Sequence, residues 1–120
     1  MKLLKITGIF LLMTSCATYM SPTEISNTLP SLTKATFYSS IDAAEAVKTS
    51  NCRVLVENRK YLAPVGLTRI GDLRNGARGI DEWVRLDGGN AYSLKSYQWQ
   101  TVNDKGESQL QLEFTTMVCE

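Results

Sequence analysis

The N-terminal segment limits what this chain can fold into, because it has the pattern of a signal peptide that is removed during export. Lys2 and Lys5 give it a positively charged start, and residues 6–13 are mainly apolar and carry no charge. Eight residues are too few for a membrane-spanning helix, which needs about 20. We therefore expect residues 1–15 to be cleaved, so that only residues 16–120 fold.

Residues 12–16, Leu-Met-Thr-Ser-Cys, resemble the lipobox of bacterial lipoproteins. In those proteins the signal peptide is cleaved before the cysteine, the thiol carries a diacylglyceryl group, and the new amino terminus is acylated. The resemblance implies that Cys16 is lipidated, with palmitate among its acyl chains. Ala17, which stands where an aspartate would retain the protein at the inner membrane, implies an outer-membrane anchor facing the periplasm. The alternative is an ordinary secretory signal with Cys16 near its cleavage site.

Composition excludes several classes of function. The chain contains no histidine, which excludes a Ser-His-Asp triad, a Cys-His pair and any imidazole metal ligand. Removal of Lys2 and Lys5 leaves 11 of the 13 basic residues against 12 acidic ones, a net charge of −1. Near-neutrality gives no electrostatic reason to bind nucleic acid or lipid headgroups. We expect no metal, no cofactor and no nucleic-acid partner.

Residues 16–33 are rich in Ser, Thr, Pro and Asn, with scattered apolar residues. This composition predicts a lipidated N-terminus followed by a flexible tether, which spans on the order of 20 Å. Ser21, Pro22 and Glu24 fit the start of a helix. Little apolar periodicity follows, so a transient turn is expected there rather than a stable helix. The remainder, residues 34–120, is predicted to form one small domain.

The first part of that domain is predicted to contain two strands, one short helix and a connection. β-Branched and aromatic residues favour the strands, two serines can cap the helix, and a proline marks the connection. The expected order is a strand at residues 34–38, a helix at 41–47, a strand at 52–57 and a connection at 58–66.

The strongest periodicity predicts a long helix at residues 68–86. Its apolar residues recur at intervals of three and four, which places them on one helical face. Residues 87–90, Asp-Gly-Gly-Asn, supply the C-terminal stop. On the opposite face, i,i+4 spacing predicts two surface ion pairs and favours a solvated face over a carboxylate site. These pairs are Arg78 with Glu82 and Asp81 with Arg85.

The last part of the chain predicts a β-hairpin, with arms at residues 90–102 and 108–118. The second arm alternates regularly between apolar and polar side chains. In the first arm, four large side chains form two pairs of opposite parity. A β-bulge between the pairs, near Lys95, would bring all four to the core face. They are Tyr92, Leu94, Tyr97 and Trp99.

Two further cysteines, Cys52 and Cys119, lie at the start of a predicted strand and the end of the last one. An exported chain meets an oxidising compartment, where uncommitted thiols are expected to bond. If Cys16 is lipidated, Cys52 with Cys119 is the only pairing that remains. The alternative is a redox-active pair, but such pairs usually have the spacing Cys-x-x-Cys at a helix start. A structural disulfide is therefore predicted, worth about 4 kcal/mol in the chain-entropy description.

A family resemblance rests on residues 73–77, Leu-Arg-Asn-Gly-Ala, on residues 88–91, Gly-Gly-Asn-Ala, and on the flanking Cys52 and Cys119. These segments resemble a family of small bacterial envelope lipoproteins of unknown function, which is similar in turn to RcsF, the outer-membrane stress-sensor lipoprotein. The resemblance implies a compact α+β domain, with one main helix packed on a small, mostly antiparallel sheet and a structural disulfide. It supplies no catalytic residue.

Three residues are candidates for contact with a partner. Arg74 and Arg78 lie one helical turn apart and could clamp an acidic ligand. Trp99 is the first choice among the aromatic residues of the hairpin, since aromatic side chains can fill a partner's pocket. Plain solvent exposure of the arginines and core packing of the tryptophan are the alternatives.

Three functions remain open at this stage. The first is a non-catalytic interaction module that is anchored to the outer membrane, faces the periplasm and binds an envelope protein. The second is an envelope-stress sensor similar to RcsF. The third is an enzyme acting on cell wall or lipid, which the lack of histidine and of any acid pair at usable spacing disfavours.

Lipidation of Cys16 can be tested on the mature protein. Intact-protein mass spectrometry is expected to show loss of residues 1–15 and a mass gain from acyl chains. Replacement of Cys16 by Ser is expected to remove that gain, because the thiol is the attachment point. A mature chain that begins elsewhere and carries no lipid would contradict the prediction.

Overall fold

The structure, a computed structural model, describes residues 22–101 and 103–120. The predicted signal peptide and Cys16 lie outside the described residues. The described elements, in chain order, are α2 (Pro22–Leu32), β1 (Thr36–Tyr38), α3 (Ser40–Lys48), β2 (Cys52–Leu62), α4 (Arg69–Leu86), β3 (Ala91–Thr101) and β4 (Ser108–Cys119). The predicted α+β class is confirmed, although three helices rather than one main helix pack on the sheet of the described chain.

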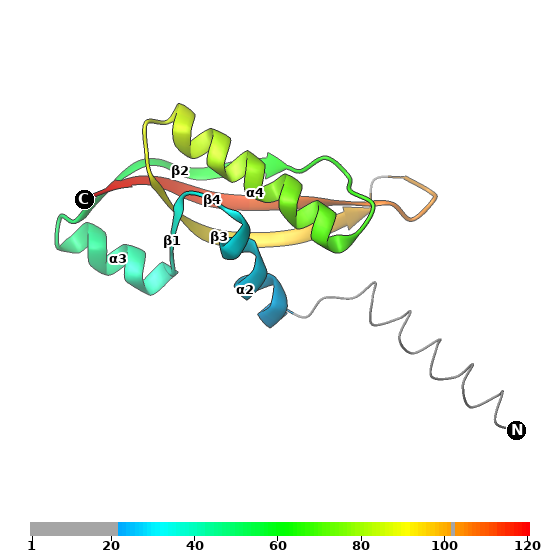
Figure 1. Cartoon of the computed structure of the whole chain (residues 1–120), viewed down its shortest axis with the longest axis horizontal. Helices are drawn as coiled ribbons and strands as arrows, with labels where there is room; N and C mark the ends of the chain where they lie inside the picture. The colour runs from blue at the N-terminus through cyan, green and yellow to red at the C-terminus, as the bar shows by residue number, and fades with distance from the viewer. Residues whose placement is uncertain (1–21, 102) are drawn as a thin grey trace, which may run out of the picture.

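The four strands form one mixed sheet in the order β1-β3-β4-β2. β1 runs parallel to β3, whereas β3–β4 and β4–β2 are antiparallel. The sheet is therefore mostly antiparallel, as expected. Helices cover parts of both faces: Thr116 of β4 bonds to Asp87 at the end of α4, while its neighbour Met117 packs with α3. Adjacent strand residues point to opposite faces, so α4 and α3 lie on opposite sides (Figure 1).

Helix α4 begins and ends where the sequence predicts. The side chain of Thr68 caps it by accepting a hydrogen bond from the Gly71 N–H, 3.0 Å away. At its other end Gly88 has a φ of +82°, a left-handed conformation that glycine adopts without steric cost. The N–H groups of Gly88 and Gly89 donate to the carbonyls of Arg85 and Val84, which is the Schellman pattern of a helix end.

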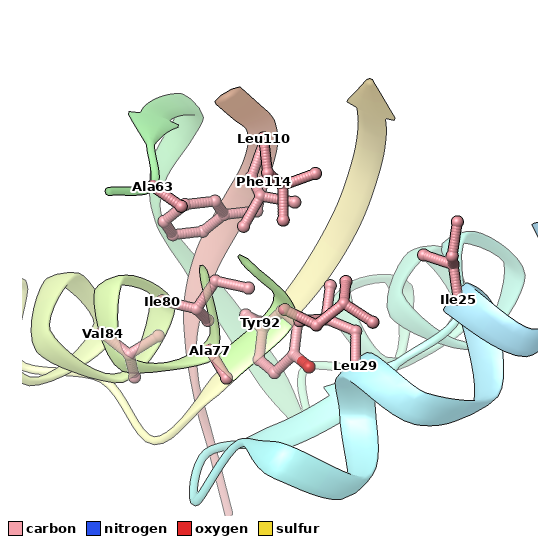
Figure 2. Packing of buried hydrophobic residues seen from close by; sticks show 11 residues of the cluster. Ile25, Leu29, Ala63, Ala77, Ile80, Val84, Tyr92, Leu110 and Phe114 are labelled. Atoms are coloured by element: carbon pink, nitrogen blue, oxygen red, sulfur yellow. The ribbon is translucent and has the colours of Figure 1, made fainter. Parts of the chain in front are cut away.

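The main core lies between α4, α2 and the sheet, where their apolar side chains meet (Figure 2). α4 contributes four of the apolar residues that recur on one helical face, Leu73, Ala77, Ile80 and Val84, whereas Ile70 is left exposed. The bulge predicted near Lys95 is present, because the β3–β4 register shifts between Leu94 and Ser96. All four large side chains of β3 consequently reach this core. Tyr92 is fully buried in it, and Leu94, Tyr97 and Trp99 are partly buried and pack against it.

The expectation of a flexible tether is wrong for its second half. Residues 22–32 form α2, and its Ile25 and Leu29 are buried in the main core beside α4 (Figure 2). These two apolar residues are one helical turn apart, too short a pattern to predict a helix from sequence. Packing against α4 supplies the stability that the isolated segment lacks. The packed part of the described chain therefore includes residues 22–32, which the prediction had placed in the tether.

The predicted connection at residues 58–66 is also wrong in its first part, because β2 continues to Leu62. β2 is an edge strand, and its register against β4 shifts twice, between Val54 and Val56 and between Val56 and Arg59. Asn58 has a φ of +58° within this irregular stretch. The irregular register breaks the two-residue alternation that identifies a strand in a sequence.

The disulfide between Cys52 and Cys119 is confirmed. The two residues face each other directly in the antiparallel register of β2 and β4, with Cα atoms 4.0 Å apart. The bond closes a 67-residue separation and joins the edge strand to the last strand of the chain. It is packed with Ala43 and Ala46 of α3, which cover this end of the sheet.

The contribution of α2 to the fold can be measured with Leu29→Ala. Leu29 is 0% exposed, so its truncation is expected to lower the free energy of unfolding by about 2–5 kcal/mol. Asn27→Ala, on the exposed side of the same helix, is the matched control and is expected to change it by less than about 0.5 kcal/mol. Equal denaturation midpoints for both variants would contradict the packing of α2.

Candidate functional site

The outer surface of α4 carries two charged residues that the rest of the described chain does not use. Arg69, Asp72, Asp81, Glu82 and Arg85 all form hydrogen bonds or ion pairs within the domain. Arg74 and Arg78 are exposed and form none with the described residues. They lie four residues apart, on one face of the helix. Two free guanidinium groups at this spacing can each donate paired hydrogen bonds to a carboxylate or phosphate group.

Arg78 also lines a cleft of about 860 Å³ between α4 and the segments around residues 34–35 and 88–90. We call this hollow the α4 cleft; its lining residues are Lys34, Ala35, Arg78, Asp81, Glu82, Val84, Arg85, Gly88, Gly89 and Asn90. Lys34 is exposed at the opposite wall. The cleft thus adds a third cation close to the pair of arginines. Sequence reasoning missed Lys34, because it belongs to the region predicted to be the start of a strand.

Asp81 fixes the wall of the α4 cleft. Its carboxylate accepts hydrogen bonds from the backbone N–H groups of Lys34 and Ala35, at 2.9–3.0 Å. These bonds hold the connection between α2 and β1 against α4. The predicted ion pair of Asp81 with Arg85 is therefore wrong, because the carboxylate is occupied by backbone donors.

The other predicted ion pair is wrong for a related reason. Glu82 pairs with Arg85, three residues later, rather than with Arg78. Both spacings place side chains on neighbouring positions of a helix, and sequence alone does not choose between them. The choice leaves the guanidinium of Arg78 free to face the cleft.

Trp99 does not join the two arginines. Its indole N–H donates to Asp72 over 2.9 Å, and the guanidinium of Arg69 lies over its ring at 4.5 Å from the centroid. The ring is half-buried and packs against the main core. These contacts satisfy both the polar and the apolar parts of the side chain. Trp99 therefore packs against the core and is not an exposed aromatic side chain on the surface of the hairpin.

The buried carboxylate of Asp87, just past the end of α4, bonds to side chains of β2 and β4. It accepts hydrogen bonds from Arg59 of β2, with Arg59 Nε to Oδ2 at 3.1 Å, and from the hydroxyl of Thr116 on β4 at 2.8 Å. The same guanidinium lies over the ring of Trp83, 4.0 Å from its centroid. The hydrogen bonds from Arg59 lower the pKa of Asp87 below its ordinary value, and burial opposes that shift. An ionised carboxylate with its acceptor sites occupied stabilises the fold.

A second hollow lies on the opposite face of the sheet, between α3 and the strands. It encloses about 480 Å³, and most of its lining is apolar. The apolar residues that line it are Ala43, Ala44, Val47, Val54, Leu94 and Met117, and two lysines, Lys48 and Lys95, line it as well. Lys95 donates a hydrogen bond to the Asn58 side chain over 2.8 Å, which holds it beside the irregular part of β2.

Comparisons with known proteins supply no further assignment. No family model, no curated protein and no solved structure matches this chain. The resemblance to RcsF-like lipoproteins therefore stays a prediction. No helix among residues 22–101 and 103–120 has the length and hydropathy of a membrane span. Within the same residues, no group of three or more cysteine or acidic side chains is placed to hold a metal ion.

The pKa shift of Asp87 predicts how stability depends on pH. A carboxyl group whose pKa is lower in the folded state than in the unfolded state stabilises the fold above the unfolded pKa, about 3.9. That contribution is lost as the pH falls through the lowered pKa. Asp87→Asn is expected to cost about 1–3 kcal/mol at neutral pH, since it weakens hydrogen bonds to a charged group.

The difference in the free energy of unfolding between Asp87→Asn and the parent protein is expected to shrink as the pH falls below about 4. Urea unfolding at a series of pH values measures it. Asp104→Asn, in the exposed turn between β3 and β4, serves as the control and is expected to follow the parent at every pH. A gap that stays constant down to pH 2 would contradict the ionised state of Asp87.

Proposed function

We propose that this protein is a non-catalytic lipoprotein, anchored to the outer membrane through Cys16, that binds an envelope protein on its periplasmic side. The observation that carries the proposal is the pair of unpartnered arginines on α4. Every other charged residue of that helix forms a hydrogen bond or ion pair within the domain. Arg74 and Arg78 are left to interact with a molecule outside it.

The chemistry of the surface indicates an acidic partner segment. Arg74, Arg78 and Lys34 present three cations along α4 and the α4 cleft. The two acids of the cleft are occupied, Asp81 by backbone N–H groups and Glu82 by Arg85. A partner that offers Asp or Glu side chains at a similar spacing would form paired hydrogen bonds with the guanidinium groups. Such contacts give orientation and specificity to a protein complex.

The domain is well suited to act as a rigid platform. α4 is fixed at its start by Asp72, in its second half by Asp81, and just past its end by Asp87. Arg74 and Arg78 therefore project from a helix that does not need to reorganise on binding. Preorganisation of this kind lowers the entropy cost of association.

The binding surface can be tested by charge reversal. The partner is first captured by crosslinking in intact envelopes, and its affinity for the purified protein is then measured. Loss of an interface arginine often costs about 2 kcal/mol, or about thirtyfold in affinity. Arg74→Glu/Arg78→Glu is expected to weaken binding by at least this factor, and the affinity of the parent protein is expected to fall as salt is added.

The matched control is Lys60→Glu/Lys105→Glu, which makes the same change in charge on exposed residues outside α4. Both double variants are first shown to unfold like the parent. Equal affinities for the two would reject the arginine surface. Turnover of a peptidoglycan or lipid substrate by the purified protein, abolished by one acidic substitution, would reject the non-catalytic proposal itself.

A sensor similar to RcsF is a variant of the same proposal, with a partner whose contact changes under stress. Deletion separates the two forms. Loss of a sensor changes the output of stress genes, whereas loss of a passive module changes an assembly without changing that output.

A further inference from the structure

The connection between β2 and α4 exposes an unusual amount of apolar surface. Four large apolar side chains lie within nine residues there: Leu62 is 52% exposed, Val65 46%, Leu67 104% and Ile70 38%. They are half of the strongly exposed large apolar residues in the described chain. We call this group the apolar tip. Single exposed apolar residues are common, but four within so short a segment indicate a contact surface.

The apolar tip is held in place by hydrogen bonds on its inner side. The Gly66 N–H donates to the buried carboxylate of Asp72 over 2.7 Å, and the Asn75 side chain donates to the Pro64 carbonyl over 2.9 Å. A Cβ at Gly66 would lie 2.8 Å from the backbone of Asp72, so the close approach requires glycine. These bonds hold the backbone of residues 64–66 against α4, while the apolar side chains of the tip remain exposed to solvent.

The position of the apolar tip relates it to the proposed lipid anchor. α2 and α4 run in broadly the same direction, and the tip lies at the start of α4, at the end of the sheet that carries the β3–β4 turn (Figure 1). Five residues separate Cys16 from Pro22, the start of α2, and the six steps from Cys16 to Pro22 span at most about 20 Å. α4 itself is about 27 Å long, given 18 residues at about 1.5 Å each. The tether is therefore shorter than the helix.

The net charge around the apolar tip is small, which favours an apolar contact over an electrostatic one. Residues 60–72 and 103–108 contain three basic and three acidic residues. Because Asp72 is buried, the rim carries these three basic residues against two acidic ones, and so small a net charge does not attract anionic headgroups strongly. A surface of a few apolar side chains binds a bilayer weakly by itself, but a lipid anchor on the same chain makes that contact intramolecular.

We propose that the apolar tip rests on the phospholipid surface of the membrane that holds the anchor, with Leu67 inserted among the acyl chains near the headgroups. This inference rests on the proposed lipidation of Cys16. The contact would fix the orientation of the domain, so that α4 rises from the membrane with Arg74 and Arg78 beside it and the α4 cleft farther out. The bilayer would then act as a second site that positions the arginine surface for its partner.

Depth-dependent fluorescence quenching tests the contact. The lipidated full-length protein is reconstituted in phosphatidylcholine vesicles that contain brominated lipid, with an environment-sensitive dye on Leu67→Cys. The native cysteines do not interfere, because Cys52 and Cys119 are bonded to each other and Cys16 carries the lipid. Leu86→Cys, an exposed apolar position at the other end of the same helix, is the matched control.

Brominated lipid is expected to quench the dye at position 67 about twofold or more, and the dye at position 86 hardly at all. Addition of phosphatidylglycerol is expected to leave the difference unchanged, since the contact is apolar. Equal quenching at both positions, or none at position 67, would overturn the proposal. A dye at position 67 that is unquenched in vesicles but crosslinks to an envelope protein would also overturn it, in favour of a protein occupant.

Flotation with the vesicles separates this proposal from the one on which it rests. A chain that floats but is not quenched at position 67 keeps its anchor and loses only the membrane contact of the apolar tip. A chain that carries no lipid and does not float overturns both. The partner affinity of the arginine variants is measured in solution and does not depend on either result.

Discussion

The packing of the apolar face of α4 against β3 and β4 is the interaction on which the rest of the structure depends. It buries Leu73, Ala77, Ile80 and Val84 against the sheet and provides the surface on which α2 lies. Because the helix is fixed in this way, polar side chains along its flanks meet distant parts of the chain in defined geometry. Three aspartates use that opportunity. Asp72 holds Gly66 and Trp99, Asp81 holds the connection between α2 and β1, and Asp87 holds β2 and β4.

This use of the aspartates explains the surface that the proposed function requires. Asp81 faces backbone donors and Asp72 faces the tryptophan, so neither neutralises an arginine on the outer side of the helix. Glu82 is paired with Arg85. The guanidinium groups of Arg74 and Arg78 consequently form no ion pair with an acidic side chain of the described residues. A domain with almost no net charge can in this way present a local cationic surface.

The apolar tip and the arginine surface lie at different parts of one rigid unit, and the two proposals fit together physically. In the proposed arrangement a short tether would limit how far the domain moves from its anchor, and the tip would limit how the domain turns. Fewer orientations then remain to be lost when a partner binds, which strengthens binding without any new contact. The disulfide supports this rigidity at the opposite end of β2, where it joins the edge strand to β4.

The sequence by itself determined the features that arise over a few neighbouring residues. Helix α4 with its glycine stop, the hairpin with its bulge near Lys95, and the pairing of Cys52 with Cys119 could all be predicted, because periodicity, turn residues and cysteine content are local or compositional properties. The exposure of Arg74 and Arg78 on one helical face follows from the same periodicity.

Only the tertiary structure decided which distant groups meet. Asp81 binds backbone 46 or 47 residues away, and Trp99 reaches Asp72 across 27 residues; no local pattern encodes such a choice. The stability of α2 was hidden for the same reason, since two buried side chains suffice once α4 provides a surface for them. The exposure of Leu67 was equally unpredictable, because the apolar content of a loop does not reveal whether the fold covers it. Contacts between segments far apart in sequence exist only after the helix and sheet have packed.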